Sequence, residues 1–242
     1  MKITSPTWRR RLLLLVTFTG LATAGALVAL QSRSQAVRDG VASSTIDTTV
    51  NEQEARSLKA LQSSLKSSLV LPSNFRQMPE FTLSDVDGEP LTETLFEGRW
   101  SLIFFGFTSC PDVCPTTLSV VKGVVEQLDE EGAQPPQVVF VTVDPARDTA
   151  SRMKEYVAYF NKDFVGVTGE QTALHALTKE LGIVVVFTAN DENPEAYTVD
   201  HTASLLLIDP ERRIRAKLNA PHEIETIVAD YLELRTGLDK LN

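Results

Sequence analysis

Two cysteines, Cys110 and Cys114, are the only thiols of the 242-residue chain, and they lie where a buried strand is expected to lead into a helix. Residues 102–107 form an apolar run without a polar interruption, which predicts a strand covered on both faces. Pro115 suits the first turn of a helix, and apolar residues at helical spacing follow it. Cys114 is therefore expected at a helix N-terminus. Unpaired N–H groups stabilise a thiolate there, so we expect at least one sulfur to have a pKa below the usual value of about 8.5.

The Cys-x3-Cys spacing supports two kinds of chemistry. Sulfurs four residues apart at a helix start can meet, so they could close a disulfide and exchange it with another protein. They could equally chelate one soft metal ion. A disulfide here would enclose only three residues, a loop too short to stabilise the fold substantially through chain entropy. The pair is therefore predicted to act in redox or metal chemistry.

The elements that position the cysteines are predicted from hydrophobic periodicity and turn signals. The expected strands cover residues 81–84, 102–107, 138–143, 164–168, 183–188, 203–208 and 213–218, and the expected helices cover 51–69, 115–128, 149–160, 171–181 and 221–234. The alternation of strands and helices changes near the end to a hairpin, which residues 209–212 connect. This order predicts an α/β, thioredoxin-like three-layer fold with a mixed sheet.

Three histidines are candidates for a third donor. His175 lies mid-helix, where we expect it to be packed or on the surface, and His222 lies at a helix start, where we expect capping or exposure. His201 directly precedes the strand 203–208, so it is expected in a loop at the sheet end that carries the cysteines, where Asp200 could influence its orientation. Two thiolates and one imidazole are a soft, low-coordinate donor set that suits copper(I). Zinc ranks second because structural zinc sites almost always have four ligands, and a blue-copper site needs a second histidine.

The N-terminal residues are predicted to anchor the chain. Arg9, Arg10 and Arg11 precede a 19-residue apolar stretch, residues 12–30, which is close to the ~20 residues that span a bilayer. A signal peptide cleaved after residues 22–24 is the alternative. From residue 41 onward 17 basic residues face 31 acidic ones, a net charge of −14, which argues against nucleic acid and anionic lipid as partners. We expect an anchor in residues 1–31, a tether with a helix in 32–71 and the thioredoxin-like domain in 72–242.

Three segments together are similar to the Sco/SenC family in order and spacing. They are Phe105-Gly106-Phe107-Thr108-Ser109-Cys110-Pro111-Asp112-Val113-Cys114-Pro115, Val143-Asp144-Pro145-Ala146-Arg147-Asp148-Thr149, and Asp200-His201-Thr202 before Leu207-Ile208-Asp209-Pro210. The resemblance covers about residues 75 to 236. It implies a membrane-tethered, thioredoxin-like copper chaperone, single-pass in the inner membrane with its C-terminal domain in the periplasm. Ser109 departs from the family pattern, because many members have a histidine or another residue there. The Asp144-Pro145 loop is expected only to shape the rim of the site.

The resemblance implies that Cys110, Cys114 and His201 are copper ligands. It also implies assembly of the dinuclear copper centre of cytochrome c oxidase, by copper delivery, by reduction of the acceptor's cysteines, or by both. The expected partner is the copper site of subunit II of the oxidase or another periplasmic copper acceptor. The alternative is a periplasmic thiol-disulfide oxidoreductase, in which Cys110 and Cys114 are the catalytic redox pair. A thiol peroxidase fits less well, because no Thr-x-x-Cys segment with an activating arginine is present.

Overall fold

The computed structural model describes residues 52–189 and 196–240. The chain divides into two units, Met1–Glu54 and Ala55–Asn242, and the described structure belongs almost entirely to the second. No helix among the described residues is long and apolar enough to cross a membrane. The predicted span, residues 12–30, and the first half of the predicted tether, residues 32–51, lie outside the described residues.

An eight-stranded mixed sheet forms the centre of the second unit, with the strand order β1-β10-β9-β4-β5-β6-β2-β3. Its strands are β1 (Ser68–Val70), β2 (Leu83–Asp85), β3 (Pro90–Leu91), β4 (Ser101–Gly106), β5 (Gln137–Thr142), β6 (Val165–Thr168), β9 (Leu205–Ile208) and β10 (Ile214–Leu218). The three central strands β4, β5 and β6 are parallel, and β9 pairs with β4 in the antiparallel sense. The mixed α/β, thioredoxin-like architecture expected from the sequence is confirmed.

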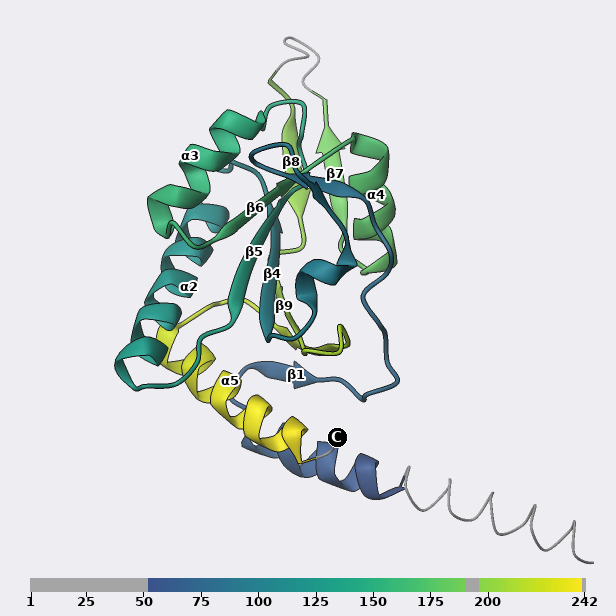
Figure 1. Ribbon diagram of the computed structural model, residues 1–242, viewed down its shortest axis with the longest axis vertical. Coiled ribbons are helices and arrows are strands. Elements are labelled where there is room, and N and C mark those ends of the chain that lie inside the picture. Colours follow the sequence, from purple (N-terminus) through teal and green to yellow (C-terminus); the bar gives the residue numbers. More distant parts are fainter. Residues whose placement is uncertain (1–51, 190–195, 241–242) are drawn as a thin grey trace, which may run out of the picture. The chain divides into compact units, whose positions relative to one another are not determined.

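Helices cover both faces of this sheet. They are α2 (Val113–Glu130), α3 (Ala150–Phe160), α4 (Gln171–Glu180) and α5 (Ile224–Asp239), with a short 3-10 helix, η1 (Glu93–Phe96), and a further helix over residues 52–64. Figure 1 shows α2 and α3 on one side of the central strands and α4 on the opposite side. All six residues of β4 are buried, which explains why an uninterrupted apolar run follows Ser101.

A second sheet consists of the two strands β7 (Val185–Thr188) and β8 (Thr198–His201), which pair only with each other. The sequence predicted residues 183–188 as another strand of the β-α series, and it predicted His201 in a loop. Both predictions were wrong, because β7 pairs outside the main sheet and His201 is the last residue of β8. Val184, Val186 and Phe187 are 62%, 48% and 45% exposed, so this segment lacks the cover on both faces that a central parallel strand receives.

The predicted helix 51–69 is also corrected, because it ends at residue 64 and β1 follows. The buried carboxylate of Asp230 accepts hydrogen bonds from the backbone N–H groups of Lys66 (2.7 Å), Ser67 (3.0 Å) and Ser68 (2.9 Å). These three N–H groups belong to successive residues. In the interior of an α-helix, the N–H groups of three successive residues do not all bond to one side chain. Asp230 on α5 therefore stops the helix, and β1 continues as a strand paired with β10.

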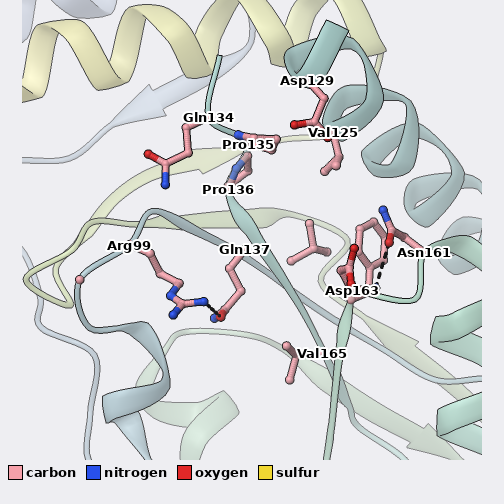
Figure 2. A pocket seen from close by; sticks show the side chains of 13 residues that line it. Arg99, Val125, Asp129, Gln134, Pro135, Pro136, Gln137, Asn161, Asp163 and Val165 are labelled. Carbon is pink, nitrogen blue, oxygen red and sulfur yellow. Dashed lines mark hydrogen bonds between the residues drawn. The ribbon is translucent and has the colours of Figure 1, made fainter. Parts of the chain in front are cut away.

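A hollow of about 660 Å³ lies at the end of the sheet where β5 begins, opposite the end that leads to the cysteines (Figure 2). Arg99 and Gln137 are joined across it by a hydrogen bond of 3.4 Å, and Asp129 and Asp163 also line it. Neither cysteine and none of the histidines contributes to this hollow. The residues predicted from the sequence to bind metal or exchange disulfides therefore lie at the other end of the sheet.

Candidate metal centre

The two cysteines lie at the junction of β4 and α2, as the sequence predicts. α2 begins at Val113, so Cys114 and Pro115 occupy its first turn. Asp112, the N-cap residue, makes no side-chain cap hydrogen bond, and the backbone N–H of Cys114 instead donates to Cys110 Sγ at 3.4 Å. The Cys110 sulfur thus partners one of the N–H groups that a helix start leaves without a backbone acceptor.

His201 Nε2 lies 3.3 Å from Cys114 Sγ, although the two residues are 87 positions apart in the sequence. The donor atoms of Cys110, Cys114 and His201 all lie within 4.8 Å of one another. Within residues 52–189 and 196–240, no other group of His, Cys, Asp and Glu side chains approaches closely enough to hold one metal ion. The structure therefore brings together the three side chains that the sequence singled out.

The imidazole of His201 is oriented for use as a donor. Its Nδ1 lies 3.1 Å from the carbonyl oxygen of Thr202, and because a carbonyl only accepts, Nδ1 carries the proton. The lone pair of Nε2 is then directed toward Cys114. Burial lowers the pKa of His201 below its ordinary value of 6.5, while the Thr202 hydrogen bond and the charge of Asp200 oppose this change. Asp200 itself is exposed, and it is the Thr202 carbonyl that orients the ring.

At least one of the two sulfurs was expected to be acidic, and Cys114 is not that sulfur. Burial raises the pKa of the Cys114 thiol, the nearby Cys110 raises it further, and a hydrogen bond with the backbone of Phe107 only partly opposes them. Cys114 is fully buried whereas Cys110 is 9% exposed. For Cys114 the cost of burying a charge therefore exceeds the stabilisation from the helix N-terminus. A bound cation would supply the missing positive charge, since a coordinating thiol is deprotonated outright.

Aromatic rings enclose the centre. Phe104 and Phe107 form T-shaped pairs with the His201 ring at centroid distances of 6.1 and 5.9 Å. Tyr156 on α3 has a buried hydroxyl without a hydrogen-bond partner, and burial together with the nearby sulfurs of Cys114 and Cys110 raises its pKa. This apolar wall limits the access of water to the inner sulfur.

The loop that follows β5 contributes more than the rim that the sequence analysis assigned to it. The buried carboxylate of Asp148 accepts hydrogen bonds from Thr108 N (3.0 Å), Thr108 Oγ1 (2.5 Å) and Thr142 Oγ1 (2.6 Å). Asp148 thereby fixes the loop that carries Cys110. One signal in the sequence could have indicated it, because the loops after two neighbouring parallel strands, β4 and β5, emerge at the same edge of the sheet.

The remaining candidates from the sequence lie outside the centre. His175 is exposed on α4, which agrees with the surface role expected. His222 is half-buried and its Nε2 lies 2.9 Å from the Ala203 carbonyl oxygen, whereas Glu223 is the N-cap of α5, so the expected capping role is not seen. Ser109 accepts a hydrogen bond of 3.1 Å from Arg152 Nη2. It therefore connects the cysteine loop to α3 and is not one of the three clustered donors.

Comparison with known proteins agrees with this geometry. The SCO1/SenC family model matches residues 71–235. The chain belongs to the SCO1/SenC family. A relative described as a putative copper-binding protein from Stutzerimonas stutzeri is 38% identical over 157 residues, which are 65% of this chain and 76% of the relative. Mitochondrial SCO2 of Saccharomyces cerevisiae is 34% identical over 162 residues, and the match spans 66% of this chain but only half of SCO2.

The solved structures that resemble this chain include copper-bound ones. ScoI of Arabidopsis thaliana with copper bound superposes with a TM-score of 0.62 at 28% identity, covering 66% of this chain and 99% of that one. ScoI of Bradyrhizobium japonicum with copper bound gives a TM-score of 0.58 at 30% identity, with the same coverage. Both matches leave out about a third of this chain.

Proposed function

We propose that this protein binds copper in the assembly of cytochrome c oxidase, and that Cys110, Cys114 and His201 are its ligands. The observation that carries the proposal is the approach of two sulfurs and one imidazole nitrogen to within 4.8 Å of one another. Membership of the SCO1/SenC family and the two copper-bound relatives support the choice of metal.

The donor set fits copper as cargo better than it fits a structural zinc ion. Two thiolates and an imidazole satisfy copper(I), which accepts two or three soft ligands, whereas structural zinc almost always takes four. The raised pKa of Cys114 means that loading of the metal releases a proton from this thiol. The neutral Nε2 of His201 needs no deprotonation. We therefore propose delivery of copper to the copper site of oxidase subunit II or to another periplasmic acceptor.

A thiol-disulfide reductase is the second candidate, favoured by the unequal environments of the sulfurs. Cys110 is the more exposed sulfur and accepts the Cys114 N–H, so it is suited to attack, while the buried Cys114 is suited to resolve the mixed disulfide. Closing the Cys110–Cys114 bond would release two electrons and two protons, which convert a disulfide of the acceptor into two thiols. Both cysteines are free in the structure, as this reaction requires at its start.

The location and the domain division also remain proposals based on the sequence. We propose residues 1–31 as an anchor in the inner membrane, 32–71 as a tether and 72–242 as the domain in the periplasm. The basic cluster at Arg9 to Arg11 followed by the apolar residues 12–30 supports this orientation. In this division residues 55–70, which the structure builds onto the sheet unit, form the end of the tether.

Copper titration of the reduced full chain tests the proposal. We expect one copper per chain, followed by absorption and, for copper(II), by electron paramagnetic resonance. His201→Ala should weaken copper(II) binding at least about tenfold and change its spectrum, because copper(II) prefers more ligands and nitrogen donors. Copper(I) should still bind to the two cysteines.

His175→Ala is the matched control, because His175 is an exposed histidine outside the centre. This substitution should leave the binding of copper(I) and copper(II) unchanged. If His201→Ala retains the copper(II) affinity and spectrum of the native chain, His201 is structural. The reductase is then the better assignment, because disulfide exchange does not require this imidazole.

A further inference from the structure

The hairpin that carries His201 has little backbone support. Among the described residues β7 and β8 pair only with each other, and no hydrogen-bonded ladder there joins them to the main sheet. A two-stranded sheet is marginally stable by itself. The position of His201, the last residue of β8, must therefore be set by side-chain packing, as of the buried Val199 in the same strand, and by contacts at the two ends of the strand.

One end is held by the turn into β9. Thr202 N donates to the carbonyl oxygen of Val184 at 3.0 Å, and Val184 N donates to Thr202 Oγ1 at 3.0 Å. These bonds continue the β7–β8 pairing by one residue beyond His201. They attach β8 to β7, which is itself separate from the main sheet, so they do not fix the hairpin relative to the cysteines.

The other end is held by three residues, Asp144, Arg147 and Tyr197, which we call the Tyr197 clamp. Tyr197 directly precedes β8, and its hydroxyl donates to Asp144 Oδ1 at 2.6 Å. Arg147 Nη1 donates to the Tyr197 carbonyl oxygen at 3.1 Å, and its guanidinium lies 4.0 Å from the centre of the Tyr197 ring. Arg147 Nε also forms an ion pair with Asp144. Asp144 is fully buried, so the clamp has a fixed base next to β5.

The clamp also reaches the cysteine side of the centre. The guanidinium carbon of Arg147 lies 5.5 Å from the centre of the Phe107 ring, and Phe107 in turn forms a T-shaped pair with His201. Phe107 directly follows β4 and precedes the loop with Cys110. One arginine therefore contacts both the start of the strand that carries His201 and the aromatic ring that packs against the imidazole.

We propose that Tyr197 is a positioning residue for His201, acting through the clamp. This inference rests on the proposed copper function of the same centre. Tyr197 lies four residues before His201, about 13 Å away along an extended strand, so it does not act as a ligand. Loss of its hydroxyl leaves the buried Asp144 Oδ1 without this donor and frees the start of β8. A ligand must be held to within about 0.5 Å of its productive position, and the imidazole is the donor that loses this support.

The two sulfurs do not depend on the clamp in this way. Cys110 and Cys114 lie at the start of α2, and their loop is held by Asp148 through Thr108. The clamp should therefore affect copper(II), for which the imidazole matters most, and leave copper(I) on the sulfurs almost unaffected.

The test compares Tyr197→Phe with Tyr231→Phe in the reduced full chain. Tyr231 on α5 donates one hydrogen bond of 3.1 Å to the Gln134 carbonyl oxygen, away from the centre, so the two variants lose the same chemical group. Tyr197→Phe should raise the copper(II) dissociation constant about three- to tenfold and shift the paramagnetic resonance spectrum. Tyr231→Phe should leave both unchanged. Tyr197→Leu, which also removes the ring over Arg147, should produce a larger shift in the same direction.

Each outcome decides the matter. If Tyr197→Phe keeps the native copper(II) spectrum and affinity while His201→Ala loses them, the copper function stands and the positioning role is refuted. If His201→Ala also has no effect, the proposed function itself fails. Circular dichroism establishes that each variant is folded, and if Tyr197→Leu does not fold, the Tyr197→Phe result alone decides.

Discussion

Gly106 is the last residue of β4, and the structure predicts that even a methyl group there disturbs the metal centre. A Cβ on Gly106 would lie 2.8 Å from Cys114 Sγ and 2.8 Å from Phe140 Cε2. Ordinary van der Waals contact begins at about 3.4 Å. Cys114 and Phe140 are both fully buried, so neither can move away into solvent. In Gly106→Ala the sulfur, the ring or the strand must therefore shift by about 0.6 Å, the difference between these two distances.

The expected magnitudes follow from this clash. Overpacking a core costs about 1–3 kcal/mol, and replacing a strand glycine by alanine returns about 0.5–1 kcal/mol of backbone entropy. We expect a net loss of about 1–2 kcal/mol in the free energy of unfolding. Metal–ligand distances tolerate only about 0.2 Å, so a displaced Cys114 sulfur should weaken copper(I) binding about 10- to 100-fold.

The assay pairs urea unfolding with competition against a copper(I) chelator, using Gly237→Ala as the control. A Cβ on Gly237 in α5 would lie 2.7 Å from Leu61 Cδ1, a comparable clash that involves the end of a flexible side chain far from the cysteines. Gly237→Ala should keep native copper affinity whatever its stability. A folded Gly106→Ala chain that binds copper(I) as tightly as the native chain would refute the reasoning.

Two further predictions concern Asp230 and the redox state of the cysteines. Burial raises the pKa of Asp230, but the hydrogen bonds from Lys66, Ser67 and Ser68 outweigh burial and hold this pKa below the ordinary value of 3.8. The ionised carboxylate therefore stabilises the folded state above about pH 4, and this stabilisation is lost as the pH falls through the folded-state pKa. Asp230→Asn should lower the unfolding free energy at neutral pH by about 2 kcal/mol and flatten the acid side of a urea-denaturation series, and an unchanged acid profile would contradict this role. The Cys110–Cys114 disulfide form should bind copper(I) far more weakly than the dithiol in chelator competition, because oxidation removes both thiolates, and equal affinities would rule out the sulfurs as ligands.

The central part of the fold was predictable because its signals are local. The apolar run of β4 is confirmed at Ser101–Gly106, and α3 begins after Thr149, whose hydroxyl accepts the Arg152 N–H as an N-cap. The Asp-Gly turn after β2 is also confirmed, with Gly88 at a φ of 85°. In each case a few neighbouring residues determine the conformation.

The wrong predictions involve partners that are distant in the sequence. Leu65 and Leu69 continue the apolar helical spacing, and it is the carboxylate of Asp230, more than 160 positions later, that binds the intervening backbone N–H groups and ends the helix. The segment 183–188 has the composition of a buried strand, but its pairing with β8 decides that it is a half-exposed hairpin. Periodicity records which residues are apolar, and it does not record which strand a segment pairs with.

The three donor residues of the candidate site could be predicted from the sequence, whereas the residues that hold them in position could not. Cys110, Cys114 and His201 could be selected because so few residues of their types exist in the chain. Asp148 and Tyr197 belong to residue types that are common on surfaces, and their roles depend on burial and on hydrogen bonds across loops. The helix position predicts a lowered pKa for at least one of the two sulfurs, whereas burial raises the pKa of Cys114.

The sequence distances between the three donors affect how metal binding is coupled to folding. Cys110 and Cys114 remain near neighbours in an unfolded chain, but His201 is 87 residues beyond Cys114 and reaches it only after β4, β5 and the β7–β8 hairpin have assembled. A ligand stabilises the native state only to the extent that it binds the unfolded chain less tightly. A metal held by the two sulfurs alone therefore raises thermal stability only slightly, even when it binds tightly, because the unfolded chain binds it as well. A metal that also binds the imidazole stabilises the native state preferentially, because only the folded chain offers all three donors.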